Sequence, residues 1–135
     1  CGAFEVRPIH LIRRPHGVVF SYARKGRGSW LRQSMLYTRR VTETRDVLRG
    51  HDHRVVRYED LAAATEETVR ALTTWIGLPF EPGQLEWAGR ERHNCGGNRM
   101  RFGGDSKIRV DYAWKTGLRS WQKVAISLLT LPARA

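Results

Sequence analysis

An arginine and a serine near the start of the chain are the side chains best suited to hold an anion. Arg13 follows a short apolar run, Ile9–Ile12, and Ser21 comes eight positions later, with a proline at position 15 between them. This order predicts a buried strand that leads directly into a helix, with Pro15 at the first helical position, where its missing N–H costs nothing. The free N–H groups and positive dipole end of a helix N-terminus attract anions, to which Arg13 adds a charged fork and Ser21 a hydroxyl donor. Residues 8–24 are therefore predicted to bind phosphate or sulfate, although a generic strand–helix junction with a solvent-facing arginine has the same pattern.

A tyrosine and two carboxylates follow the second predicted strand. The β-branched segment 54–58 ends at Tyr58, and Glu59 and Asp60 come next, so that the cluster occupies residues 54–61. The carboxyl ends of parallel strands face the crevice in which α/β proteins bind ligands. We therefore expect Arg13 and Tyr58 to face the same crevice. A tyrosine at a strand end with a carboxylate pair that opens a turn is the commoner meaning of such a pattern.

A glycine- and arginine-rich loop, residues 90–110, is the third cluster. Glycine lets backbone N–H groups approach an anion closely, and arginine completes the charge. A loop of this length in a compact domain is usually functional or disordered, and a solvated basic loop is the alternative. The residues of interest are His93, Gly96, Gly97, Asn98, Arg99 and Arg101.

The composition is that of an ordinary globular chain with a large positive charge. Its 135 residues suffice for one domain at most, and the formal net charge is +11. Arginine supplies nearly all of this charge and suits bidentate recognition of phosphate, although a GC-rich genome would raise arginine everywhere. Neither a membrane-spanning apolar run nor a signal peptide is visible, so we expect a cytoplasmic protein that does not contact a membrane.

The cysteine and histidine spacings favour neither disulfides nor a metal. Cys1 and Cys95 are too few for a disulfide framework, which predicts reduced thiols. The pairs His51/His53 and His93/Cys95 lack the spacing typical of zinc ligands, so we expect no metal site. Neither GxxxxGK[ST] nor GxGxxG occurs, which argues against a nucleotide triphosphatase or a dinucleotide-binding domain.

Helices are predicted between and after the two strands. They span 29–49, capped by Ser29 and closed by Gly50; 66–76, capped by Thr65 and closed by Gly77; and two segments within 111–131, the first capped by Asp111. Strands separated by helices indicate a parallel sheet with helices on its faces. Two strands are fewer than an independent sheet usually needs, so part of the fold is expected to be missing.

Taken together and in this order, the three clusters resemble the sulfotransferases that use 3′-phosphoadenosine 5′-phosphosulfate (PAPS). IRRPHGVVFSYAR is similar to their 3′-phosphate-binding segment, RxPxxxxxS, and VVRYEDL to the strand and turn that follow. HNCGGNRMRF and IRVDYAWKTGL resemble the GGNxxR…IxxDxxW pattern of bacterial and carbohydrate-type members. The similarity covers nearly the whole chain. It implies a P-loop-type, three-layer α/β/α fold with a parallel sheet, of which residues 1–135 would be one partial, C-terminal domain.

The resemblance also implies roles for particular residues. Arg13 and Ser21 would bind the 3′-phosphate of PAPS, and Tyr58 would lie near the adenosine. The complete enzyme would transfer a sulfuryl group to a hydroxyl or amine acceptor and release 3′-phosphoadenosine 5′-phosphate, with no metal. The loop over the nucleotide would include Gly97, Asn98 and Arg101.

Departures from the family pattern bear on activity. Arg14 and His16 stand where the family commonly has an acidic or small polar residue and a basic residue. The glycine-rich loop for the 5′-phosphosulfate and the usual catalytic base lie upstream in the family, and neither is found in this sequence. No catalytic residue is therefore assigned, and we expect no turnover by this chain alone, which resembles an enzyme cut at both ends.

A non-catalytic, basic nucleotide- or nucleic-acid-binding module is the competing hypothesis. It is suggested by the charge and by tryptophans among arginines, and it predicts an affinity that falls steeply with salt. The basic residues form no stripe along one predicted helix, and no known nucleic-acid-binding motif occurs, so a nucleic-acid partner is disfavoured. A chain without a stable fold is a third possibility.

Overall fold

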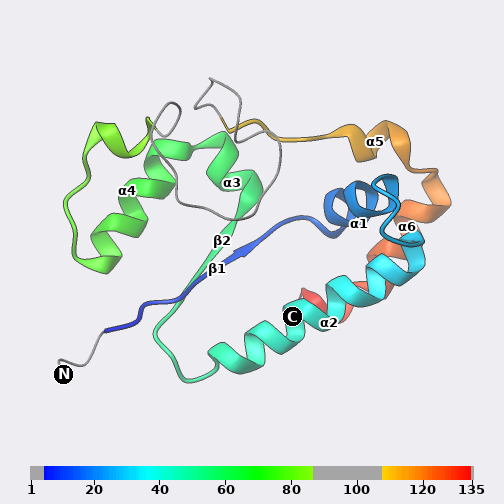
Figure 1. Ribbon diagram of the computed structural model, residues 1–135, viewed down its shortest axis with the longest axis horizontal. Coiled ribbons are helices and arrows are strands. Elements are labelled where there is room, and N and C mark those ends of the chain that lie inside the picture. The colour runs from blue at the N-terminus through cyan, green and yellow to red at the C-terminus, as the bar shows by residue number, and fades with distance from the viewer. Residues whose placement is uncertain (1–4, 87–107, 135) are drawn as a thin grey trace. The chain divides into compact units, whose positions relative to one another are not determined.

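The computed structural model describes residues 5–86 and 108–134 of the chain. It separates the chain into two compact units, of which unit 1 is Cys1–Glu59 with Val110–Ala135 and unit 2 is Asp60–Arg109. The elements, labelled in Figure 1 where there is room, are β1 (Ile9–Ile12), α1 (Pro15–Arg24), α2 (Trp30–Leu48), β2 (Arg54–Arg57), α3 (Tyr58–Ala63), α4 (Thr65–Ile76), η1 (Pro82–Gln84), α5 (Ala113–Gly117), α6 (Ser120–Leu129) and η3 (Leu131–Ala133).

The two strands form the parallel sheet that the sequence predicts. Ile9 lies beside Arg54 and Ile12 beside Arg57, while α1 and α2 make the connection between the strands (Figure 1). Two parallel strands require such a long connection because the chain must return to the end of the sheet at which the first strand began. The protein is thus mixed α/β, with one two-stranded parallel sheet among the described residues.

The prediction of a buried first strand was wrong. Ile9 and Leu11 are 47% and 53% exposed, and in β2 only Val56 is buried while Val55 is 55% exposed. The apolar run identified the strand correctly, but a run of this kind reports a buried strand only where helices or further strands cover both faces. Two strands with their described neighbours do not provide that cover.

The first helix begins where the sequence predicts. Pro15 occupies the first helical position, and Arg14 is the N-cap residue with no side-chain hydrogen bond to the helix N-terminus. No acidic residue lies in the first turn of α1. The positive end of this helix dipole therefore has no neutralising carboxylate from its own helix.

The long second helix is capped as expected. The Ser29 hydroxyl accepts a hydrogen bond from the Arg32 N–H at 3.3 Å, and Gly50 just beyond the helix has a φ of +87°. This φ lies in the left-handed region that glycine adopts at little cost. One face of α2 is buried, comprising Gln33, Ser34, Val41 and Leu48.

The core of unit 1 lies between α1 and the C-terminal segment. Val19 and Ile126 are fully buried and pack with Leu118, and their partly buried neighbours are Phe20, Trp30 and Trp114. Within the apolar run 124–131, Val124 and Leu128 are about three-fifths exposed. The run is amphipathic, and Ile126 alone within α6 is buried.

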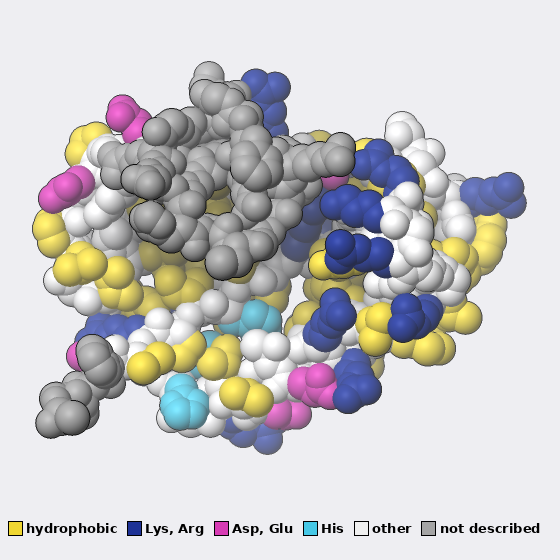
Figure 2. Space-filling model, viewed as in Figure 1, with side chains coloured by type: hydrophobic (Ala, Val, Ile, Leu, Met, Phe, Trp, Pro, Cys, Tyr) yellow, Lys and Arg dark blue, Asp and Glu magenta, His cyan; other side chains and the backbone are white. Residues whose placement is uncertain are grey.

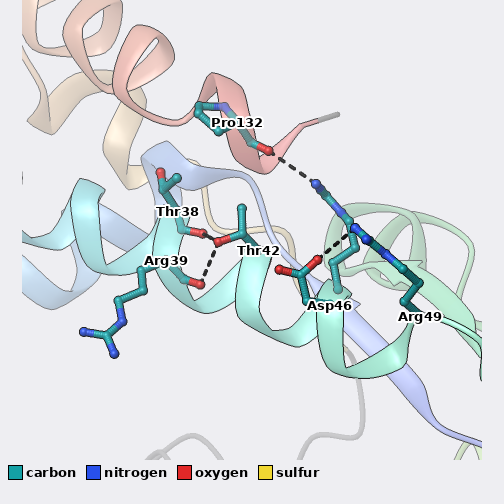
Figure 3. A network of polar contacts seen from close by, with 7 residues as sticks. Thr38, Arg39, Thr42, Asp46, Arg49 and Pro132 are labelled. Atoms are coloured by element: carbon teal, nitrogen blue, oxygen red, sulfur yellow. Dashed lines mark hydrogen bonds and ion pairs between the residues drawn. The ribbon is translucent and has the colours of Figure 1, made fainter.

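Polar contacts fasten α2 to the end of the chain. The Thr38 hydroxyl donates to the Leu129 carbonyl at 2.9 Å, and the Arg45 guanidinium donates to the carbonyls of Pro132 and Ala133 at 3.3 and 2.9 Å. Figure 3 shows Pro132 facing α2 across this contact. One of these acceptors, the Leu129 carbonyl, belongs to the last turn of α6, where carbonyls have no helical partner.

Two smaller expectations need correction. Tyr58 begins α3 instead of ending the second strand. Thr65 is the first residue of α4 and not its cap, because its hydroxyl donates to the Leu61 carbonyl at 2.8 Å and the N-cap position is Ala64. Gly77 ends α4 with a φ of +81°, as predicted.

Across residues 5–86 and 108–134, no helix has the length and apolar character needed to cross a membrane.

Candidate anion-binding site

The Arg13 guanidinium lies at the centre of a cluster of polar and aromatic side chains in unit 1. Its carbon stands 4.7 Å from the centre of the Tyr58 ring, and its Nη2 donates to Asp111 Oδ2 at 3.2 Å. The Arg13 side chain is three-quarters buried. Arg13 and Tyr58, which follow the ends of the two strands, are therefore in contact, while the crevice that both are expected to face stays a prediction. A cation over an aromatic face contributes ~0.5–2 kcal/mol, depending on its desolvation.

Gly17 gives the guanidinium its place against the first turn of α1. A Cβ atom on Gly17 would stand only 3.2 Å from Arg13 Nε, which is tighter than an ordinary contact. The positive guanidinium and the positive end of the helix dipole therefore occupy the same region. Ser21 is four residues beyond Gly17 on α1, so the two residues share a helix face.

Two other helices hold the backbone immediately before α1. The Tyr37 hydroxyl, on α2, donates to the Arg13 carbonyl at 2.8 Å, and the Arg14 N–H donates to Glu59 Oε1, on α3, at 3.0 Å. The Arg13 carbonyl and the Arg14 N–H belong to a single peptide group, which we call the turn peptide. Both of its polar ends are thus bonded to side chains from distant parts of the sequence.

The environment of Tyr37 keeps its hydroxyl protonated. Burial raises the pKa of the Tyr37 phenol, and the Glu59 carboxylate nearby raises this pKa further, with Arg134 opposing. The hydroxyl consequently remains a donor to Arg13 up to a higher pH than an exposed tyrosine would.

Within residues 5–86 and 108–134, Asp111 is the carboxylate that forms an ion pair with Arg13. Its Oδ1 accepts the Ala113 N–H at 2.9 Å, although the N-cap residue of α5 is Tyr112 and not, as predicted, Asp111. That backbone hydrogen bond is the main reason that the pKa of Asp111 is lowered; burial opposes it, while Arg13 and then Arg24 lower the pKa further. Asp111 therefore stays ionised and neutralises part of the positive charge at the start of α1.

His16 serves the packing of unit 1. Its ring stacks on Trp114 at 4.8 Å, and its Nε2 lies 2.9 Å from the Lys123 carbonyl and 3.2 Å from the Ser127 hydroxyl. These contacts join the start of α1 to α5 and α6. A histidine whose Nε2 is engaged in this way is poorly placed to act as a general base on a ligand held by Arg13.

Part of the predicted site lies outside the described residues. This part comprises His93, Gly96, Gly97, Asn98, Arg99 and Arg101. Elsewhere, within the ranges that the structure describes, no three His, Cys, Asp or Glu side chains come together as metal ligands would.

Sequence reasoning gave Gly17 and Tyr37 no role at the anion site. Glu59 and Asp111 lie in segments that it singled out, but their contacts with the start of α1 were not predicted. Their partners are 45 residues away for Glu59 and 98 for Asp111. No local pattern reports a contact of that range.

Comparison with known proteins returned no match of any kind: no family model, no curated protein and no solved structure is similar to this chain.

Proposed function

We propose that this chain carries the 3′-phosphate-binding part of a PAPS-dependent sulfotransferase. The observation that carries the proposal is the placement of the Arg13 guanidinium over Tyr58 and against Gly17, which shares a face of α1 with Ser21. Arg13 would bind the 3′-phosphate, Ser21 would donate to it, and the Tyr58 ring would lie near the adenosine. The motif resemblance supplies the identity of the nucleotide.

Local electrostatics support an anion as the ligand. A guanidinium and the positive end of a helix dipole repel each other when they lie side by side. An anion bound beside them compensates both charges and so stabilises the arrangement. Asp111 is the only carboxylate bonded to Arg13 among the described residues, and it uses one nitrogen of the fork. A guanidinium has five N–H donors, of which the bond to Asp111 uses one, and its planar fork matches the geometry of a phosphate.

In the complete enzyme the reaction would be a sulfuryl transfer. The acceptor oxygen or nitrogen would form a bond to sulfur as the bond from sulfur to the 5′-phosphate oxygen breaks, releasing 3′-phosphoadenosine 5′-phosphate. The acceptor proton would pass to a base for which this chain offers no assigned residue. Positioning and charge stabilisation would dominate catalysis, as in phosphoryl transfer.

An exposed basic surface favours a second candidate, a nucleic-acid-binding module. Figure 2 shows Lys and Arg side chains gathered over the face where α1 and α2 lie. The exposed basic residues of this part of the chain include Arg24, Lys25, Arg27 and Arg32. A surface of this kind attracts any polyanion without reading its sequence.

Competition binding separates the two candidates. We expect the 135-residue chain to bind adenosine 3′,5′-bisphosphate at least about tenfold more tightly than 5′-AMP, because a bidentate, charge-assisted phosphate contact contributes on the order of 1.5–3 kcal/mol. Isothermal titration at two salt concentrations gives both affinities, with a single-stranded oligonucleotide as the third ligand. Equal affinities for the two nucleotides, together with tight and salt-sensitive oligonucleotide binding, would replace the sulfotransferase proposal with the binding module.

A further inference from the structure

The turn peptide is bonded at both ends by side chains to which the motif resemblance assigns no role. Its carbonyl accepts from Tyr37 at 2.8 Å and its N–H donates to Glu59 at 3.0 Å. Tyr37 comes from the middle of α2 and Glu59 from the start of α3. Two bonds on opposite edges of one peptide plane leave that plane little freedom to rotate, since rotation would lengthen both.

The orientation of this peptide plane sets the direction in which the Arg13 side chain leaves the backbone. The turn peptide includes the carbonyl carbon of Arg13, so its rotation changes the backbone angle ψ of Arg13 and the direction of the Cα–Cβ bond relative to α1. The guanidinium at the far end of the side chain must meet three partners at once, namely Tyr58, Asp111 and the surface beside Gly17. A small rotation at the turn is amplified along a side chain of this length.

We infer that Tyr37 and Glu59 are positioning residues that aim Arg13 at the 3′-phosphate of a nucleotide. This inference rests on the proposed function for the identity of the ligand and on the two hydrogen bonds for the mechanism. Neither side chain touches the anion. Glu59 places a negative charge near an anion site and is useful there because its oxygen fixes the Arg14 N–H.

Two substitutions separate the hydrogen-bonding role of Glu59 from the effect of its charge. Glu59→Gln keeps an oxygen acceptor for the Arg14 N–H and removes the charge, whereas Glu59→Ala removes both. If aiming matters, Glu59→Ala weakens binding of adenosine 3′,5′-bisphosphate and Glu59→Gln restores it. If Glu59 acted only by repelling the anion, both variants would tighten binding. Asp60→Ala removes a neighbouring exposed carboxylate and is the matched control.

Tyr37→Phe tests the other end of the turn peptide. This variant keeps the ring and removes the hydroxyl, so we expect the preference for adenosine 3′,5′-bisphosphate over 5′-AMP to fall by about threefold to tenfold, the equivalent of one hydrogen bond. Tyr22→Phe, on α1, is the matched control and should leave the preference unchanged. A merely structural role for Tyr37 would lower the thermal midpoint of unfolding and leave the nucleotide preference of the folded protein as it was.

The closing experiment measures both nucleotide affinities for the wild type and the Tyr37 and Glu59 variants by titration, and the Arg14 amide exchange rate without ligand by NMR. We expect the wild type to prefer the bisphosphate, the Tyr37→Phe and Glu59→Ala variants to lose much of that preference, and Arg14 exchange to accelerate in Glu59→Ala. A wild type that prefers the bisphosphate, with both variants unchanged, would overturn the inference alone. A wild type with no preference would overturn the proposed function and the aiming role with it, and unchanged Arg14 exchange would overturn the hydrogen bond itself.

Discussion

The start and the middle of α1 are held by opposite kinds of interaction. At its start, hydrogen bonds and a cation–aromatic contact fix Arg13 and the turn peptide, with partners on α2, α3 and the segment before α5. Farther along, Val19 is fully buried against Leu118 and Ile126. Apolar burial is the main source of folding free energy, whereas a net hydrogen bond contributes only ~1 kcal/mol. The middle of α1 therefore provides stability, and its first turn provides directional placement for a ligand.

Two glycines show the same difference between apolar packing and placement of a polar group. Gly117 allows the Phe20 ring to lie directly against the backbone of α5, and Gly17 allows the Arg13 guanidinium to lie against α1. A ring held in a core cannot move aside, but the end of an arginine side chain can. Substitution of the two glycines should thus affect different properties of the protein.

Gly117→Ala should have the largest effect on stability. A Cβ atom at this position would lie far inside contact distance of the Phe20 ring, so either the ring or α5 must shift. We expect a loss of about 2–4 kcal/mol in the free energy of unfolding, as for other overpacked cores. Urea denaturation measures this, with Gly50→Ala as the control, because a Cβ at Gly50 meets nothing and only its positive φ penalises alanine. Equal losses in the two variants would contradict the packing assigned to Gly117.

Asp111→Asn should tighten nucleotide binding while it lowers stability. The substitution removes the carboxylate charge bonded to Arg13, so we expect affinity for adenosine 3′,5′-bisphosphate to rise by about threefold to tenfold at low salt and less at high salt. A binding titration at two ionic strengths checks this. Unchanged or weaker binding would mean that Asp111 orients Arg13 and does not compete with the phosphate.

The same variant has a signature in the pH dependence of stability. The pKa of Asp111 is lowered in the folded protein, chiefly by the Ala113 N–H and also by Arg13. Its contribution is therefore complete above the unfolded pKa, near ~3.9, and is lost as pH falls through the lower folded pKa. Asp111→Asn should flatten the acid side of the profile of unfolding free energy against pH, with little change in its slope at neutral pH.

Gly17→Ala should weaken nucleotide binding slightly and should not lower the free energy of unfolding. Alanine is favoured over glycine in a helix by up to about 1 kcal/mol, which raises or preserves the free energy of unfolding. The new Cβ would displace the Arg13 guanidinium by a few tenths of an ångström, so we expect affinity for the bisphosphate to fall about twofold to fivefold. A binding loss that came with an equal loss of stability would show that Gly17 supports folding and not the placement of Arg13.

Local signals in the sequence predicted the elements well. Pro15 marked the start of α1, Ser29 capped α2, and Gly77 ended α4, because each of these depends on the backbone geometry of a few consecutive residues. The alternation of strands and helices likewise predicted the parallel pairing of β1 and β2. The exposure of Ile9 and Leu11 could not be predicted, since it depends on what covers the sheet.

The candidate site was predicted in part. Arg13 and Tyr58 followed from the rule that strand ends share one edge of a sheet. The bonds from Tyr37 and Glu59 to the turn peptide did not follow, because they depend on how α2 and α3 pack against the start of α1. The ion pair between Arg13 and Asp111 could not be predicted for the same reason, because the two residues are 98 positions apart in the sequence.

The central claim is that Arg13 recognises the 3′-phosphate, and a ligand-by-mutation cycle tests it most directly. Affinities of adenosine 3′,5′-bisphosphate and 5′-AMP are measured by titration for the wild type and for Arg13→Ala, with the exposed Arg32→Ala as control. We expect Arg13→Ala to weaken binding of the bisphosphate by about tenfold to a hundredfold and to leave binding of 5′-AMP almost unchanged. Only the bisphosphate has the 3′-phosphate that Arg13 binds. Equal weakening of both nucleotides, or of neither, would contradict the claim.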